Sequence, residues 1–174
     1  MSGFNERMQP LRELMKHKGL EAIVLRRNPN LAWAIAGRAH VPTTIDAACF
    51  DLIITHDSAT AVTNVVEAPR LIAEELPSDV NVKTIKWSEG RDSQLPTGAK
   101  VGSDQPGADR IDLGTEIEII RASLIEADVE RFKKICIDAA VALGNAMKQV
   151  VSSDREIDVA GLITHALWQA DLEI

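Results

Sequence analysis

One short apolar run, closed at both ends by turn residues, constrains the fold of this chain more than any other stretch. Residues 20–25 read LEAIVL, follow Gly19 and are soon followed by Pro29. An aliphatic run of this length between turn signals predicts a buried strand. Pro29 can begin a helix, because its missing N–H costs nothing in the first turn. We therefore expect a strand, then a helical turn over residues 32–36 that ends with Gly37 in the left-handed conformation.

Helical and strand patterns alternate on both sides of this run. The expected elements are a helix over residues 4–18, strands over 47–55 and 60–66, a helix over 67–76 and strands over 80–87 and 99–102. The strands at 47–55 and 60–66 are joined by a short polar turn, which predicts an antiparallel hairpin. Residues 103–114 have the composition of a loop. Interleaved strands and helices predict an α/β domain over residues 1–115, with a mixed β-sheet of about six strands and flanking helices.

The pattern becomes helical after residue 115. Ser123 and Glu126 have capping-box spacing, and apolar residues then recur at i, i+3 and i+4 from Val129 to Met147. A second capping box at residues 153–156 begins a helix that reaches Trp168. Amphipathic helices need a surface to pack on, so we expect residues 116–174 to be a linker and a helical pair from an incomplete second domain.

The order of these segments resembles the creatinase, prolidase and Xaa-Pro aminopeptidase family. The resemblance rests on GLEAIVL at 19–25, NPNLAWAIAG at 28–37, EIEIIR at 116–121, DVERF at 128–132 and DREIDVA at 154–160. Trp33 stands where the family usually has tyrosine. Leu124 and Ile125 replace the family's lysine-serine pair. The matching segments are spread over nearly the whole chain.

The resemblance implies a creatinase/prolidase-like N-terminal domain of ribonuclease-H-like architecture, followed by the first helices of a truncated pita-bread catalytic domain. In this family two divalent metal ions (Mn, Co or Zn) are held by two aspartates, a histidine and two glutamates, all downstream of such helices. Hard oxygen ligands with one imidazole suit a two-metal site that activates water. We therefore expect no catalytic residue, metal site or cofactor within this chain, and two metal ions in the parent enzyme.

The leading functional hypothesis is the non-catalytic N-terminal domain of a metal-dependent Xaa-Pro aminopeptidase or dipeptidase, which shapes substrate access and dimerisation. The alternatives are a protein-binding module of a catalytically dead relative and a creatine amidinohydrolase-type enzyme. In either enzyme we expect a homodimer, and for the peptidase a peptide substrate. The candidate substrate-proximal residues are Trp33, Arg38 and His40, on the turn and loop that follow the first strand.

Other reactive side chains have simpler structural roles. Asp46 and Asp57 have ten residues between them, as the family's metal-binding aspartates do, but turn capping is the better interpretation. Cys49 and Cys136 lie in apolar contexts and are expected to be reduced core thiols. His165 is expected to be a partly buried structural residue.

Charge and composition exclude several classes of partner. The net charge of −7 and the pI of about 5.1 disfavour nucleic-acid binding. No apolar run approaches the roughly 20 residues that a membrane span needs. The first ten residues lack the basic and apolar segments of a signal peptide, so a cytoplasmic location is expected.

Overall fold

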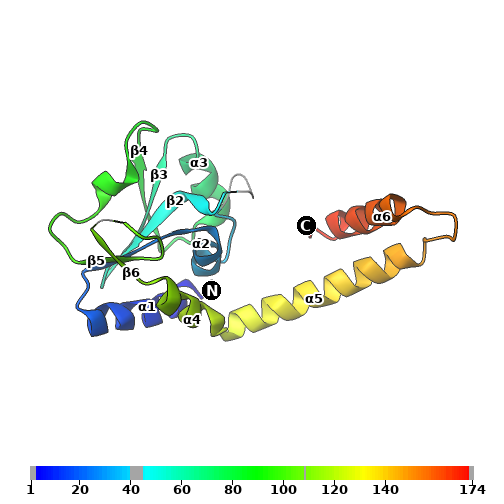
Figure 1. The fold of residues 1–174 in the computed structure, drawn as a ribbon, viewed down its shortest axis with the longest axis horizontal. Coiled ribbons are helices and arrows are strands. Elements are labelled where there is room, and N and C mark those ends of the chain that lie inside the picture. Colours follow the sequence, from blue (N-terminus) through cyan, green and yellow to red (C-terminus); the bar gives the residue numbers. More distant parts are fainter. Residues whose placement is uncertain (1–2, 40–44, 108, 173–174) are drawn as a thin grey trace. The chain divides into compact units, whose positions relative to one another are not determined.

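The structure, a computed structural model, describes residues 3–39, 45–107 and 109–172. The chain divides into two compact units, Met1–Ile125 and Glu126–Ile174. The first unit is a six-stranded sheet with helices, and the second is a pair of helices (Figure 1). The expected class, an α/β domain with a mixed sheet followed by a helical pair, is confirmed.

The buried run at residues 20–25 lies inside the sheet and has strands on both sides. The strands are β1 (Ala22–Arg27), β2 (Ala47–Ile54), β3 (Ala59–Asn64), β4 (Asn81–Ile85), β5 (Val101–Ser103) and β6 (Arg110–Asp112). Their order across the sheet is β4-β3-β2-β1-β5-β6. β2 is antiparallel to β1 and β3, and the other three pairings are parallel. The hairpin of β2 and β3 is confirmed.

The helical elements begin and end where glycine, proline and charge patterns favour it. They are α1 (Phe4–Lys18), α2 (Asn28–Ile35), α3 (Ala68–Arg70), the π-helix η1 (Leu71–Glu75), the 3-10 helix η2 (Arg91–Gln94), α4 (Gly114–Ala122), α5 (Glu126–Met147) and α6 (Glu156–Gln169). α1 runs through Pro10 and ends at Gly19, whose φ of 60° is left-handed. α2 ends with Ala36 at φ 57°, so the left-handed residue is one position earlier than expected at Gly37.

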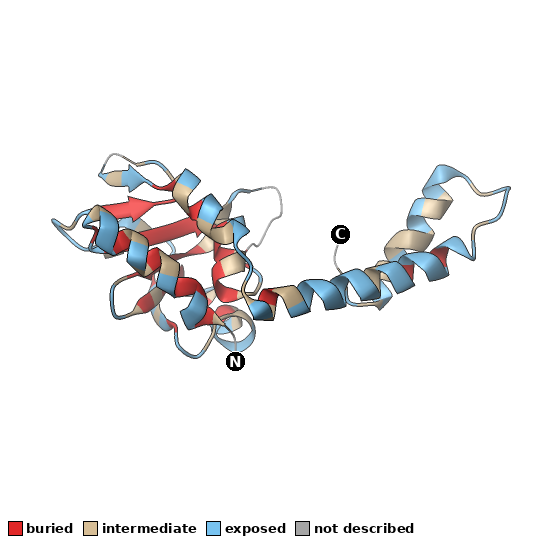
Figure 2. Cartoon of the chain, turned by 90° about the horizontal axis from the view of Figure 1, so that it is seen from below, coloured by how far each residue is buried: buried red, intermediate tan, exposed pale blue. Residues whose placement is uncertain are grey.

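The larger core lies between one face of the sheet and the helices α1, α2 and α4. Phe4, Met8 and Leu11 of α1 pack there with Leu31 of α2 and Ile117 of α4. A smaller apolar cluster on the opposite face contains Ala22, Val24, Ile53, Val62, Ile85 and Val101, covered in part by Leu95 and Ala99. Figure 2 shows the buried residues concentrated in the strands and on the inner sides of the helices of this unit.

Three local expectations are corrected by the structure. The expected loop at 103–114 contains β6, which pairs in parallel with β5. The expected helix over 67–76 is a single α-helical turn followed by a π-helical turn. At the start of α6, the cap is formed by Asp158, whose carboxylate accepts the N–H of Arg155 at 3.1 Å, and not by Ser153.

The division between the units falls at Ile125, whereas the boundary expected from the sequence was residue 115. α4 starts at that expected boundary and buries Ile117 in the core of the first unit. Among the described residues, no helix is long and apolar enough to cross a membrane.

Candidate functional site

The predicted site residues follow β1, where the chain turns into α2. Trp33 lies on α2, is half-buried and packs against the larger core. Its indole Nε1 is buried and donates no hydrogen bond to the described residues. Arg38 is exposed, and its backbone N–H donates to Glu75 Oε2 at 2.6 Å. His40 lies outside the described residues.

A hydrogen bond to Glu75 connects the turn between Trp33 and Arg38 to the end of η1. Glu75 accepts the backbone N–H of Arg38 and also pairs with Arg70 at 3.5 Å. Neither Trp33 nor Arg38 lines any of four hollows of about 380–620 Å³ in the described part of the chain. The structure thus places the two residues on one turn, next to the segment 40–44 that lies outside the described residues.

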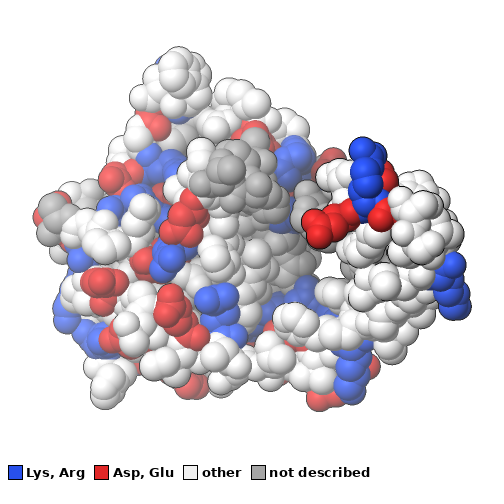
Figure 3. Space-filling model, turned by 45° about the vertical axis from the view of Figure 1, so that its right-hand side comes forward, with Lys and Arg blue, Asp and Glu red and all other residues white. Residues whose placement is uncertain are grey.

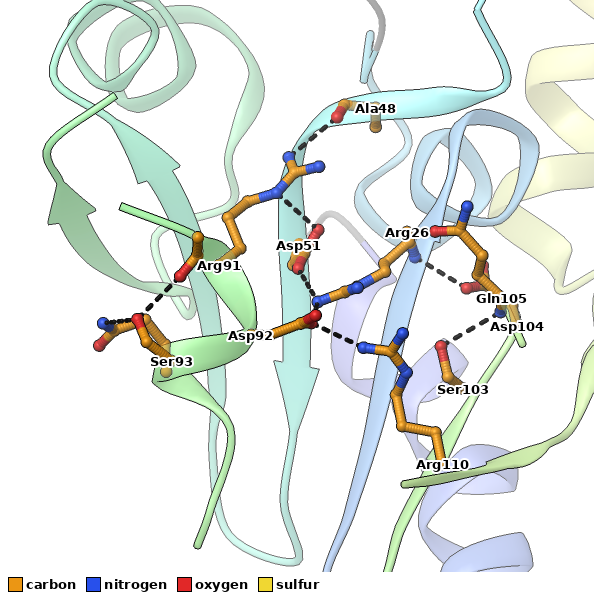
Figure 4. A network of polar contacts seen from close by, with 12 residues as sticks. Arg26, Ala48, Asp51, Arg91, Asp92, Ser93, Ser103, Asp104, Gln105 and Arg110 are labelled. Carbon is orange, nitrogen blue, oxygen red and sulfur yellow. Dashed lines mark hydrogen bonds and ion pairs between the residues drawn. The ribbon is translucent and has the colours of Figure 1, made fainter. Parts of the chain in front are cut away.

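An ionic cluster that was not predicted from the sequence lies on the opposite face of the sheet (Figure 4). It consists of Arg26 of β1, Asp51 of β2, Arg91 and Asp92 of η2, and Arg110 of β6. Arg26 and Asp51 follow the alternation of Val24 and Ile53, so they share the face of the smaller apolar cluster. A buried aspartate in the middle of the apolar run at 47–54 was the available signal.

Distances in the ionic cluster show that each of its two carboxylates pairs with two arginines. Asp51 lies 2.7 Å from Arg26 Nη2 and 3.1 Å from Arg91 Nε. Asp92 pairs with the same Arg26 nitrogen, and with Arg110 Nη1 at 2.6 Å. Arg91 Nη1 also donates to the carbonyl of Ala48 at 2.9 Å. These contacts fasten η2 across the sheet face that the helices leave uncovered.

Burial raises the pKa of both carboxylates of the ionic cluster, but their net pKa shifts have opposite signs. Asp51 is almost completely buried, and this desolvation raises its pKa, with Arg91 and Arg26 opposing the shift. Neither of its oxygens accepts a hydrogen bond of good geometry from the described residues. For Asp92, partial burial also raises the pKa, but hydrogen bonds from Arg26 and Arg110 outweigh it and the net shift is downward.

A second buried carboxylate, that of Asp104, accepts hydrogen bonds at a register shift in β1. The pairing of β1 with β2 shifts register between Leu25 and Arg27. Asp104 accepts the backbone N–H groups of Arg26 at 2.9 Å and Arg27 at 3.1 Å, and the side-chain amide of Asn30 at 2.9 Å. Burial raises the pKa of Asp104, opposed by these three hydrogen bonds. Asp104 therefore satisfies two backbone donors beside the register shift and one side-chain donor of α2.

None of these groups forms a catalytic constellation. The arginines and aspartates of the ionic cluster are engaged with one another, and no nucleophile pairs with a base there. Both cysteines are free thiols, as expected; Cys49 is half-buried and packs against the larger core, whereas Cys136 is exposed and is not the core thiol expected from the sequence. His165 is exposed on α6, and not partly buried as expected.

The described residues also lack the donors that a two-metal site requires. Among them, no group of three or more His, Cys, Asp or Glu side chains could hold a metal ion. Asp46 accepts a hydrogen bond from Arg27 Nε at 2.8 Å, which is an ordinary surface contact. Acidic and basic side chains are interspersed on the face seen in Figure 3, and neither sign forms a continuous patch there.

The fold and the site together define a class of protein. It is a mixed α/β domain whose polar clusters serve the structure, followed by an amphipathic helical pair. No protein-family model matches the chain, and no curated protein matches it in sequence.

Solved structures with the same fold include prolidases and Xaa-Pro dipeptidases. The prolidase from Pyrococcus horikoshii OT3 is 16% identical with a TM-score of 0.72, over 94% of this chain and 48% of its own. The Xaa-Pro dipeptidase from Bacillus anthracis is 12% identical with a TM-score of 0.71, over 95% of this chain and 49% of its own. The prolidase from Pyrococcus furiosus is 15% identical with a TM-score of 0.71, over 94% and 52%. The chain has the fold of these proteins and spans about half their length.

Proposed function

We propose that this chain is the non-catalytic N-terminal part of a metal-dependent Xaa-Pro dipeptidase or aminopeptidase. The observation that carries the proposal is the similarity of fold to a prolidase over 94% of the chain, at a TM-score of 0.72. The order of the sequence segments around β1, α4, α5 and α6 supports the same family.

In this proposal the hydrolytic chemistry belongs to residues outside the chain. Two divalent metal ions would activate a water molecule there. The first unit provides a rigid surface beside that site. A surface of this kind is useful because binding and positioning of substrate need groups held by a stable scaffold.

Trp33 and Arg38, with His40 beyond the described residues, are proposed to shape substrate access. Two observations support this role. The buried indole N–H of Trp33 has no acceptor among the described residues, and a buried donor favours a partner. The backbone of Arg38, an exposed residue, is fixed by its hydrogen bond to Glu75. Dimerisation is the second proposed role of this part of the protein.

The coding sequence beyond Ile174 tests the proposal. A downstream set of two aspartates, one histidine and two glutamates at family order would support a metal-dependent peptidase. The related fold without those ligands would instead indicate a protein-binding module. An unrelated downstream sequence, or a stop codon directly after Ile174 in the native gene, would contradict the proposal.

Substrate specificity then separates the enzyme hypotheses. Hydrolysis of Gly-Pro by the complete polypeptide would support the peptidase assignment, whereas hydrolysis of creatine without dipeptide cleavage would support the amidinohydrolase. In the peptidase, Trp33→Ala is expected to raise KM for Gly-Pro with a smaller effect on kcat. An unchanged KM would remove Trp33 from the access role without affecting the assignment of the family.

A further inference from the structure

A hollow of about 620 Å³ lies beside the ionic cluster, within the first unit. Part of its lining is apolar and belongs to the smaller apolar cluster or packs against it: Leu95, Ala99 and Val101. Three charged side chains also line it: Asp92, Asp109 and Arg110. An apolar surface with a few charged groups, in a hollow of this size, is typical of sites that bind small molecules.

The ionic cluster has one more positive charge than negative charges, since it contains three arginines and two aspartates. Arg26 pairs with both carboxylates. Arg91 pairs with Asp51 and also donates to a backbone carbonyl. Arg110 pairs with Asp92 alone, and Asp92 is shared with Arg26. The positive charge that is least compensated is therefore that of Arg110, which lines the hollow.

The guanidinium of Arg110 is buried but uses few of its donors. Its side chain is 12% exposed, and Nη1 donates to Asp92 at 2.6 Å (Figure 4). Nε is buried without an acceptor, and Nη2 donates no hydrogen bond to the described residues. A Cβ atom at position 107 would overlap the guanidinium, so Gly107 leaves the room that it occupies. A desolvated cation with unused donors favours an anionic acceptor.

The carboxylate of Asp109 lines the same hollow and is also uncompensated. Asp109 is exposed, and no ion pair joins it to Arg110 or to another residue in the described part of the chain. Two opposite charges therefore line one hollow without neutralising each other. A ligand that carries both a carboxylate and an ammonium group is complementary to this arrangement, because each of its charges finds an opposite charge.

We propose that this hollow binds a small zwitterion with an apolar side chain, namely an amino acid or a dipeptide. The ligand's carboxylate accepts hydrogen bonds from Arg110, and its ammonium group donates to Asp109. Its apolar side chain covers Leu95 and Val101, and removes their surface from water. The inference does not depend on the peptidase assignment, because neither Trp33 nor Arg38 lines this hollow.

Titration of the isotope-labelled 174-residue chain, followed by NMR, tests the ligand class. The probes are L-leucine and leucyl-leucine, and the tighter of the two identifies an amino acid or a dipeptide as the ligand. We expect a dissociation constant of about 1 mM and shifts of the amide signals of Thr97, Gly98 and Ala99, which line the hollow. Leucinamide lacks the carboxylate and isocaproate lacks the ammonium group, so each should bind at least about tenfold more weakly than leucine.

Two variants and a matched control test the residues. Asp109→Asn and Arg110→Gln should each weaken binding of the tighter probe at least about tenfold. The control Asp57→Asn, at an exposed aspartate of the turn between β2 and β3, should leave it unchanged. Urea unfolding checks the fold of Arg110→Gln, because this change also removes a partner of Asp92. If that variant does not fold, Asp109→Asn and the two leucine analogues still decide.

Three results would overturn the proposal. The first is no binding of either probe by the wild type up to about 20 mM. The second is binding of leucinamide or isocaproate as tight as that of leucine. The third is equal binding by the wild type and Asp109→Asn, or equal weakening by Asp57→Asn. None of these results bears on the similarity of fold to the prolidases, so failure here is distinguishable from failure of the proposed function.

Discussion

At the scale of single residues, the charge of Asp51 links folding to pH. Its pKa is raised chiefly by burial, so the folded chain takes up a proton more readily than the unfolded chain. The contribution of this group to stability is therefore fully present below its unfolded pKa, near 3.8, and is lost as pH rises through the higher folded value.

Asp51→Asn tests this sign, because asparagine keeps the shape and cannot titrate. We expect the free energy of unfolding of the wild type, relative to Asp51→Asn, to increase as the pH falls from 7 toward 4. Urea unfolding at four pH values in this range measures it. A difference that shrinks on acidification would mean that the ion pairs with Arg26 and Arg91 outweigh burial. Asp92 has a lowered pKa, so the sign is opposite. Its contribution to stability is present above the unfolded pKa and is lost as the pH falls through the lower folded value.

Asp104 is expected to be the most sensitive polar residue of the first unit. Asp104→Ala leaves three donors around the end of β1 without their acceptor, and unsatisfied buried donors predict a loss of about 2–4 kcal/mol. Asp112→Ala is the control, since its carboxylate accepts one exposed backbone N–H, from Gly114, and is expected to cost about 1 kcal/mol or less. Equal losses in thermal or urea unfolding would contradict this role.

The sequence allowed some of these residues to be recognised and not others. An aspartate inside the apolar run of β2 signals a buried charge that needs partners. Its partners Arg26 and Arg91 are separated from it by 25 and 40 residues, and only the strand order brings them together. The candidates Trp33 and Arg38 were chosen from a local pattern. Such a pattern predicts the turn on which they lie, but not which parts of the molecule lie opposite that turn.

At the scale of elements, local patterns predicted what local forces determine. The buried run of β1, the hairpin of β2 and β3 and the glycine end of α1 all follow from residues close in sequence. β6 has only three residues and exists because β5 offers it an edge to pair with. The π-helical turn of η1 likewise has no pattern that distinguishes it from an α-helix.

α4 provides a prediction at this scale, because its two neighbouring isoleucines have opposite environments. Ile117 is 0% exposed in the core of the first unit, and Ile119 is 66% exposed. Ile117→Ala is expected to destabilise the first unit by about 2–4 kcal/mol, whereas Ile119→Ala should change stability by no more than about 0.5 kcal/mol. Similar effects in urea unfolding would mean that α4 does not belong to this core.

At the scale of the whole molecule, the first unit should fold without the helical pair. It contains nearly all of the buried apolar residues, and its 125 residues exceed the roughly 40 that an independent core requires. We expect residues 1–125 to unfold cooperatively at a temperature close to that of the same transition in the full chain. A chain of residues 1–115 should be less stable because it lacks Ile117. Loss of any cooperative transition in the 1–125 protein would contradict the division into units.

In the proposed assignment this chain is one part of a peptidase, and the metal chemistry belongs to residues beyond it. The most direct test is Mn²⁺-dependent cleavage of Gly-Pro, measured for the 174-residue chain and for the complete product of its gene under the same conditions. We predict cleavage by the complete product and none by the 174-residue chain. Cleavage by the 174-residue chain alone, or none by a metal-loaded complete product, would contradict the claim.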